Sequence, residues 1–319
     1  MVNRSQPLLT IGIPTYNRAE CYLPLALSSA LAQDYANLEI IVSDNASADE
    51  TEAYVRSVAD ARIRYFRHEK NIGAAQNQNF CVEKARGAFF LLLHDDDLID
   101  PDFISVCAQA VRGNSAVGVV RTGVRLIDAE GRVLSSSENS AAGLSFEDFL
   151  RAWFSGETLH YLPATMFNTG ALKRLGGFHS RTYMFEDAVV LVRLAAELGR
   201  VDVRDVKASF RRHGENLGGH PSHALSWVDD CMFLRDVILE SISSADQEWA
   251  RADANRFLAR KSYRHAAGLS SFSDRWMLYW TIYRTFGHRH LPPPLQAAKW
   301  SRRLQRRLGK FVPRVNTGL

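Results

Sequence analysis

Apolar and polar residues follow one another along the first hundred residues in a pattern typical of strands separated by helices. Four short apolar runs predict buried strands, and the segments between them repeat apolar residues every three or four positions, as helices do. The predicted strands are residues 8–13, 38–42, 63–66 and 88–93, and the predicted helices are residues 20–33, 49–58 and 73–84. Strands that are apolar throughout and separated by helices predict an α/β fold: a Rossmann-like, mostly parallel sheet covered by helices on both faces.

The second part of the chain is less regular. Residues 102–111 predict another helix and residues 118–127 another strand, with a hairpin-like turn at 129–131. From residue 222 the pattern is mostly helical to the end, interrupted by three prolines at 292–294. We therefore expect an α/β domain over residues 1–219, with halves of about 1–127 and 128–219, and a helical C-terminal extension over 220–319.

The composition is that of an ordinary folded protein. With 319 residues, 46% of them hydrophobic, the chain can bury a substantial core. Its four cysteines are isolated, so the sequence predicts neither a zinc site nor a disulfide framework and favours a reducing cytoplasm. The first residues are polar rather than signal-like, and the apolar runs are shorter than the ~20 residues that cross a bilayer. We expect a soluble or surface-bound protein.

The charge is unevenly distributed. Residues 275–319 hold ten Lys and Arg and no acidic residue, although the whole chain has a net charge of only +4. Within residues 295–311, apolar side chains recur every three or four positions among basic ones; these are Ala297, Trp300, Leu304, Leu308 and Phe311. A basic amphipathic helix with aromatic anchors predicts binding to an anionic membrane surface. A helix docked on the protein or on a second subunit is the alternative. Nucleic acid is not expected, because no recognised binding module surrounds the tail.

Polar side chains follow the apolar strands at the points where they end. The run at 88–93 leads into Asp95, Asp96 and Asp97, and ligands of open α/β sheets bind at the carboxyl ends of the strands. Three adjacent carboxylates are unfavourable unless something neutralises them. At a strand end that faces a cleft, the usual partner is a hard divalent cation shared with a diphosphate. A solvated acidic turn leading into the next helix is the alternative.

Several short motifs occur in a fixed order. They are Ile13-Pro14-Thr15-Tyr16-Asn17-Arg18, then Ile41 to Asp49 around Asp44-Asn45, then Asn71-Ile72-Gly73, then Leu93-His94-Asp95-Asp96-Asp97, and finally Gly176-Gly177-Phe178 with Glu186-Asp187. In this order and spacing, residues 7–215 resemble glycosyltransferase family 2, of the bacterial cell-envelope polysaccharide type. The resemblance implies the GT-A fold and transfer of a sugar from a nucleoside diphosphate donor, with inversion at the anomeric carbon.

The resemblance implies that the first strand ends bind the nucleotide. Tyr16 would stack on the base, and Asp44 and Asn45 would accept hydrogen bonds from it, although many relatives have a second Asp where this chain has Asn45. The predicted nucleotide-binding residues are Pro14, Thr15, Tyr16, Asn17, Asp44, Asn45, Asn71, Gly73, Asn79 and Asp95. We favour a UDP- or dTDP-type donor. A polar turn after Pro14 and a helix cap at Asp44 are the alternatives.

The resemblance also implies the metal ligands. It assigns the main contact with Mn²⁺ or Mg²⁺ to Asp96, with Asp97 in support. His94 stands where relatives often have the first Asp of the motif, and we expect it to be structural rather than a ligand. Gln78 stands where the family often has Arg, which removes a positive charge from the pocket.

A second acidic pair would supply the base. Direct inversion needs a base within hydrogen-bond reach of the acceptor hydroxyl. By resemblance Asp187 is this base and Glu186 helps to position the acceptor. The alternative is that the pair merely starts the helix predicted over residues 188–198, where acids favour the helix dipole. Possible contacts to the diphosphate or the acceptor are Arg212, His213, His160 and Thr165, with a surface basic turn as the alternative for residues 211–213.

The leading hypothesis is a metal-dependent inverting glycosyltransferase with a glycan or polyprenyl-linked acceptor. We expect it in the cytoplasm, peripheral to the inner face of the cell membrane. A sugar-nucleotide pyrophosphorylase would need a Gly-rich phosphate loop after the first strand, and residues 14–17 are not one. The other alternative is a catalytically degenerate subunit that binds nucleotide sugar or serves as a scaffold, although Asp96 and Asp187 are retained. The sequence predicts no particular oligomeric state.

Overall fold

Parallel strands form the first half of the sheet. In the computed structural model, which describes residues 6–214 and 224–287, these strands are β1 (Leu9–Thr15), β2 (Leu38–Asp44), β3 (Ile63–Arg67) and β4 (Phe89–Leu92). β1 lies between β2 and β4 and is parallel to both, and β3 is parallel to β2. Every residue of β1, β2 and β4 is buried, which explains why these strands are mostly apolar in the sequence.

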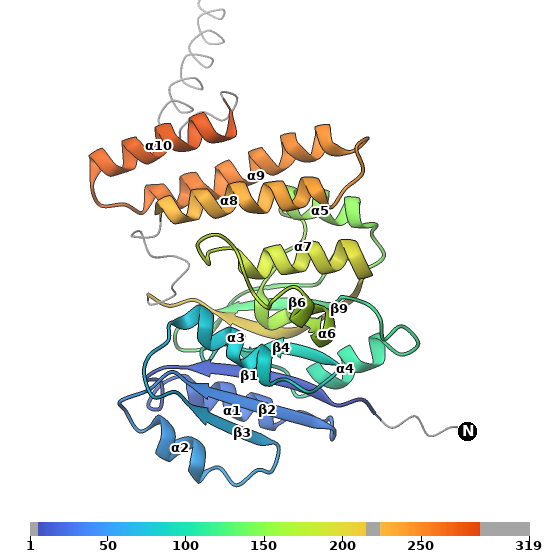
Figure 1. The fold of residues 1–319 in the computed structure, drawn as a ribbon, viewed down its shortest axis with the longest axis vertical. Coiled ribbons are helices and arrows are strands. Elements are labelled where there is room, and N and C mark those ends of the chain that lie inside the picture. The colour runs from blue at the N-terminus through green and yellow to red at the C-terminus, as the bar shows by residue number, and fades with distance from the viewer. Residues whose placement is uncertain (1–5, 215–223, 288–319) are drawn as a thin grey trace, which may run out of the picture.

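Helices cover both faces of these strands (Figure 1). They are α1 (Leu23–Leu31), α2 (Thr51–Ser57), α3 (Ala74–Lys84) and α4 (Phe103–Ala110). The buried apolar side chains separate into two clusters. Leu27 of α1 and Phe103 of α4 belong to one cluster, while Cys81 and Val82 of α3 belong to the other. The predicted α/β class is confirmed.

The second half of the sheet mixes strand directions. Its strands are β5 (Leu98–Ile99), β6 (Val119–Ile127), β7 (Val133–Ser137), β8 (Thr165–Asn168) and β9 (Arg200–Arg211). Among the described residues the strand order is β3-β2-β1-β4-β8-β6-β9-β5, with β7 paired to β6 across the predicted turn. β8 is antiparallel to both β4 and β6, and β9 is parallel to β6. The carboxyl end of β9 therefore lies at the same edge of the sheet as those of β1, β2 and β4.

The remaining helices stack on one side of the sheet. They are α5 (Phe146–Ser155), α6 (Thr169–Arg174), α7 (Glu186–Leu198), α8 (Ala224–Glu240), α9 (Gln247–Ala267) and α10 (Phe272–Phe286), with a short 3₁₀ turn, η1 (Leu162–Ala164). Figure 1 shows α7 between the sheet and the helices α8 to α10. One apolar cluster joins Phe90 of β4, Leu191 of α7, Leu234 of α8, Leu258 of α9 and Ile282 of α10. The C-terminal helices thus share a core with the α/β part.

The described helices also bear on the predicted membrane contact. In residues 6–214 and 224–287, no helix has the length and apolar content needed to cross a membrane. The basic segment 295–311, on which the membrane prediction rests, lies outside the described residues, and so does the predicted boundary near residue 219.

Candidate active site

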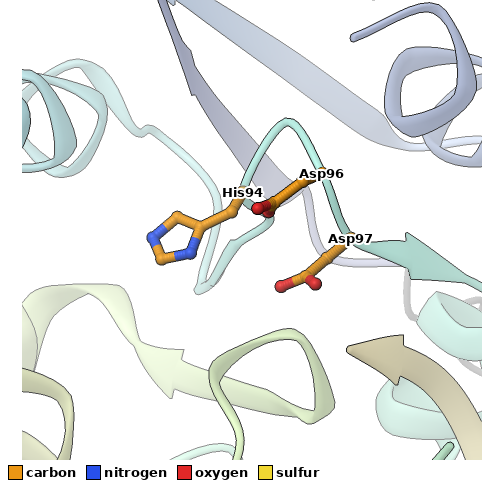
Figure 2. Close-up of side chains that lie close together, drawn as sticks. All are labelled: His94, Asp96 and Asp97. Atoms are coloured by element: carbon orange, nitrogen blue, oxygen red, sulfur yellow. The ribbon is translucent and has the colours of Figure 1, made fainter. Parts of the chain in front are cut away.

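The acidic cluster, which consists of Asp95, Asp96 and Asp97, lies on the turn between β4 and β5. A bond from the Leu93 N–H to the Gly12 carbonyl (2.9 Å) continues the sheet to the start of this turn, and a bond from the Asp97 N–H to the His94 carbonyl (3.1 Å) closes it. Candidate ligand atoms of His94, Asp96 and Asp97 lie within 4.8 Å of one another. Figure 2 shows these three side chains around one small space.

Asp97 is held from β9. It is fully buried, and its Oδ1 accepts a hydrogen bond from the backbone N–H of Arg211 (2.8 Å), while its Oδ2 is buried with no hydrogen-bond partner. Burial, and then the charge of Asp96, raise the pKa of Asp97 well above its usual range. A buried carboxylate oxygen without a donor needs a cation or a proton.

His213 completes this side of the site. Its Nε2 lies 2.7 Å from Oδ2 of Asp96, so the loop after β9 meets the loop after β4. A cavity of about 530 Å³ adjoins this contact and is lined by Arg18, Cys21, Tyr22, His213 and Gly214. Small-molecule sites commonly occupy ~300–1,000 Å³, so this space can hold part of a ligand.

The residues present fit a divalent cation. The unpaired Oδ2 of Asp97 and the carboxylate of Asp96 are hard oxygen ligands, which Mg²⁺ and Mn²⁺ prefer. A cation at this point would also offset the mutual repulsion that raises the pKa of Asp97. Asp96 and Asp97 would hold it, with the imidazoles of His94 and His213 beside them.

Two of the departures from the family pattern, His94 and Gln78, contact each other. Nε2 of His94 lies 3.2 Å from Nε2 of Gln78, which comes from α3. Where relatives often carry an acid and an arginine, this chain therefore has a histidine and a glutamine that can share a hydrogen bond. No sequence pattern indicates this contact, because it joins residues sixteen positions apart on different elements.

The end of β1 presents the predicted base-binding residues. Tyr16 is 45% exposed, which suits an aromatic surface on which a base can stack. Thr15 is buried, and its hydroxyl lies beside the Asp95 carboxyl. Burial raises the pKa of Asp95 to about 6, although the neighbouring Thr15 hydroxyl lowers it. Pro14 lies in β1 opposite Ser43 of β2.

Asp44 and Asn45 bind mainly to the protein itself. The buried Asp44 carboxylate accepts hydrogen bonds from the Ser47 N–H (2.8 Å) and the Tyr65 hydroxyl (2.6 Å). Asn45 donates to Asn71 Oδ1 (3.0 Å) and accepts from the backbone N–H of Ile72 (2.8 Å); Asn71 Oδ1 also accepts from the N–H of Gly73 (2.9 Å). These bonds join the ends of β2 and β3, and direct contact with a base stays a prediction.

The side chains of Asn17 and Asn79 also form hydrogen bonds to the backbone of distant segments. Asn17, with a φ of 54°, accepts a hydrogen bond from the Ala48 N–H (2.7 Å). The Asn79 amide binds the backbone of Phe178 on both sides, accepting from its N–H (2.7 Å) and donating to its carbonyl (3.0 Å). A role for Asn79 in the donor pocket stays a prediction, because its amide already links α3 to the Gly176-Gly177-Phe178 loop.

The second acidic pair begins α7. Nε2 of His160 lies 3.2 Å from Oδ2 of Asp187. Burial by itself would raise the pKa of Asp187, but His160, the Ala188 N–H and Lys261 outweigh it and lower this pKa. Burial, and then the charge of Asp187, raise the pKa of Glu186 to about 8. At neutral pH the pair therefore has an ionised Asp187 and a protonated Glu186.

Contacts between neighbouring residues connect the two acidic groups. Tyr161 follows His160 in the chain, and its hydroxyl lies 3.2 Å from the Arg212 guanidinium. Arg212 precedes His213, which contacts Asp96. The predicted residues His160, Arg212 and His213 therefore lie along one path from Asp187 to the acidic cluster.

Arg211 and Thr165 are buried and form hydrogen bonds with other parts of the protein. Arg211 is 1% exposed and its side chain donates to the carbonyls of Asp96, Asp128 and Ala129, so it cannot clamp a diphosphate as part of a basic trio. Thr165 is buried in β8 and donates to the carbonyl of Tyr161 (3.2 Å). The sequence suggested neither the burial of Arg211 nor the placement of Lys261 near Asp187, since both depend on long-range packing.

Comparison with known proteins identifies the family of the chain. The family model described as glycosyl transferase family 2 matches residues 10–176, more than half of the chain. A Campylobacter jejuni protein named GalNAc(5)-diNAcBac-PP-undecaprenol beta-1,3-glucosyltransferase is 38% identical over 160 residues, which cover 47% of this chain and 50% of that protein. The chain matches half or less of the length of such curated relatives.

Solved structures share the fold at low sequence identity. Staphylococcus aureus TarS 1-349 in complex with UDP-GlcNAc has a TM-score of 0.66 at 17% identity, covering 88% of this chain and 82% of that one. The mannosyltransferase PcManGT from Pyrobaculum calidifontis, in complex with GDP-Man and Mn²⁺, has a TM-score of 0.54 at 19% identity, covering 86% and 79%. From the family match and this fold, the chain belongs to glycosyl transferase family 2, a family of sugar-transferring enzymes.

Proposed function

We propose that the chain is a metal-dependent inverting glycosyltransferase that moves a sugar from a nucleoside diphosphate sugar, of the UDP or dTDP type, to a glycan or polyprenyl-linked acceptor. One observation carries the proposal. At one edge of the sheet, a carboxylate cluster with an unpaired buried oxygen on Asp97 is connected through residues 160–161 and 212–213 to the ionised Asp187. The complexes of TarS with UDP-GlcNAc and of PcManGT with GDP-Man and Mn²⁺ support a nucleotide-sugar donor and a cation.

On the donor side, Tyr16 would stack on the base. Asp96 and Asp97 would hold the cation, which supplies positive charge to the leaving diphosphate when it is bound. His213 contacts Asp96 and lines the adjacent cavity, so it is placed to orient this carboxylate and to reach the diphosphate. Thr15, buried at the end of β1 beside Asp95, offers a further donor or acceptor to the ribose side of the ligand.

On the acceptor side, Asp187 would act as the base. The acceptor oxygen forms a bond to the anomeric carbon, its proton passes to Asp187, and the bond from that carbon to the diphosphate breaks with its electron pair on the departing nucleotide. His160 and Lys261 keep Asp187 ionised. Glu186, protonated at neutral pH, can donate a hydrogen bond to an acceptor oxygen.

A lipid-linked acceptor is supported by the Campylobacter jejuni relative, whose name contains an undecaprenol-linked substrate. The ten basic residues after position 274 would hold the enzyme at an anionic membrane surface. Sedimentation with anionic vesicles tests this part, comparing the full chain with a form that lacks residues 288–319. Equal pelleting of both forms would contradict the membrane contact.

A screen of nucleoside diphosphate sugars with Mn²⁺ or Mg²⁺ tests the enzymatic proposal. We expect at least one donor to raise the melting temperature only with the cation, and to be hydrolysed slowly with water as the acceptor. Binding without turnover, for every donor and cation tested, would instead favour the catalytically degenerate binding subunit.

A further inference from the structure

A helix of the C-terminal extension holds the loop that precedes the acidic pair. Asp230 of α8 is fully buried, and its carboxylate accepts four hydrogen bonds from this loop. The donors are the Ser180 hydroxyl (2.6 Å) and the backbone N–H groups of Thr182 (2.9 Å), Met184 (2.6 Å) and Phe185 (3.2 Å). Phe185 directly precedes Glu186, so these bonds extend to the residue just before α7.

The same bonds fix a strained backbone. Tyr183 has a φ of 59°, a conformation that residues other than glycine rarely adopt, and its side chain is 42% exposed. The N–H groups on either side of it, from Thr182 and Met184, bind different oxygens of Asp230. Strained conformations persist only where the surroundings enforce them, and they are concentrated at functional sites. Here Asp230 provides the enforcing contacts.

Other contacts bring the C-terminal helices to the same loop. The Thr182 hydroxyl donates to the carbonyl of Ser226 in α8 (2.8 Å). Nζ of Lys261, in α9, lies 5.9 Å from the centre of the Phe185 ring. Figure 1 shows α8 and α9 lying over α7, on the side away from the sheet.

Charged residues of these helices affect the pKa values of both carboxyl groups of the acidic pair. After burial and Asp187, the charge of Asp230 contributes to the raised pKa of Glu186. Lys261 contributes to the lowered pKa of Asp187, after burial, His160 and a backbone N–H. These pKa effects and the hydrogen bonds lead to the same conclusion: Asp230 and Lys261 lie close enough to Glu186 and Asp187 to affect their charge states.

We propose that Asp230 is a positioning residue for sugar transfer, which fixes residues 180–185 from α8 so that Glu186 and Asp187 meet the acceptor in the required orientation. The inference rests on the proposed function, in which Asp187 takes the acceptor proton. It makes the C-terminal helices part of the catalytic apparatus. Displacing a reacting group by ~1 Å can cost on the order of 100-fold in rate, so a loosened loop would be costly to turnover.

The test is Asp230→Asn in the full chain. An amide keeps the size of the carboxylate but has only one accepting oxygen, so some of the four donors lose their acceptor. Asp229→Asn is the matched control, because Asp229 is the preceding residue of α8 and is exposed. We would measure the Kd of UDP with Mn²⁺, the kcat and KM for hydrolysis of the donor found in the screen, and the hydrogen exchange of residues 180–185.

We expect Asp230→Asn to lower kcat by about 10- to 100-fold, with the UDP Kd and the donor KM changed by less than about 3-fold and exchange of residues 180–185 accelerated. Asp229→Asn should match the wild type in all three. Unchanged kcat in Asp230→Asn, or a parallel loss of UDP binding, would overturn the proposal, since the second result indicates general misfolding rather than positioning.

A milder variant covers the case in which Asp230→Asn does not fold. Ser180→Ala removes one donor and leaves the carboxylate bound to three N–H groups, so kcat should fall by about 3- to 10-fold with UDP binding retained. Wild-type kcat in Ser180→Ala would then overturn the proposal. Asp187→Asn, measured in parallel, separates the two levels: if it keeps turnover the proposed function fails, whereas if it loses turnover and the loop variants do not, only the role of Asp230 fails.

Discussion

Replacing Glu186 by Gln should change how the stability of the protein depends on pH. Burial and the neighbouring charge of Asp187 raise the pKa of Glu186 to about 8, against an ordinary value of 4.5. Between these two pH values the folded protein keeps the proton and the unfolded chain has lost it. The contribution of this group to stability is therefore fully present below about pH 4.5 and is lost as the pH rises through about 8.

The magnitude follows from the separation of the two pKa values. Each pH unit corresponds to about 1.4 kcal/mol, so ionising Glu186 in the folded protein costs at most about 5 kcal/mol. Relaxation and water penetration reduce such penalties, and we expect about 1–3 kcal/mol. A glutamine side chain is uncharged at every pH, so Glu186→Gln should match the wild type near pH 5 and exceed its stability by this amount near pH 9.

Urea unfolding at pH 5, 7 and 9 measures the difference. Glu197→Gln is the control, since Glu197 lies on the same helix with its side chain 52% exposed and should give the same small change at each pH. A constant difference between Glu186→Gln and the wild type across the pH range would refute the reasoning, because it would mean that Glu186 ionises normally in the folded protein.

Four further substitutions test individual contacts. His160→Gln removes a group that lowers the pKa of Asp187, so the acidic limb of the pH–rate profile should move to higher pH; an unmoved limb would separate His160 from the base. Gln78→Arg and His94→Asp, which each replace one side of their mutual contact, should have non-additive effects on UDP binding measured by calorimetry; additive effects would contradict the pairing of these side chains. Asn79→Ala breaks two hydrogen bonds and should lower the free energy of unfolding by about 1–3 kcal/mol with UDP affinity retained, whereas a large loss of affinity would assign this residue to the donor pocket.

The first half of the fold could be predicted closely, because its signals are local. The buried strands β1, β2 and β4 are mostly apolar, and their polar ends indicate the edge of the sheet at which a ligand is expected. The order of the later strands could not be predicted in this way. β8 enters the sheet between β4 and β6 in the opposite direction, and nothing in its four residues specifies that position.

The candidate site, too, could be predicted only in part. Asp96, Asp97 and Asp187 belong to short motifs, so the sequence alone could single them out as candidate site residues. The residues that position these carboxylates could not be identified from the sequence. Arg211 has the charge expected of a diphosphate clamp, but the fold buries it beneath the acidic turn. Asp230 lies more than forty residues from the pair it supports, and only the packing of α8 on α7 brings it there.

Titration of UDP into the wild type, Asp96→Asn and Asp187→Asn, each with and without Mn²⁺, is the most direct test of the metal-dependent transferase. Turnover of the donor is measured in the same three proteins. We predict that Mn²⁺ strengthens UDP binding to the wild type and to Asp187→Asn but not to Asp96→Asn, and that both variants lose at least about 100-fold in turnover. Manganese-dependent UDP binding in Asp96→Asn, or wild-type turnover in Asp187→Asn, would contradict it.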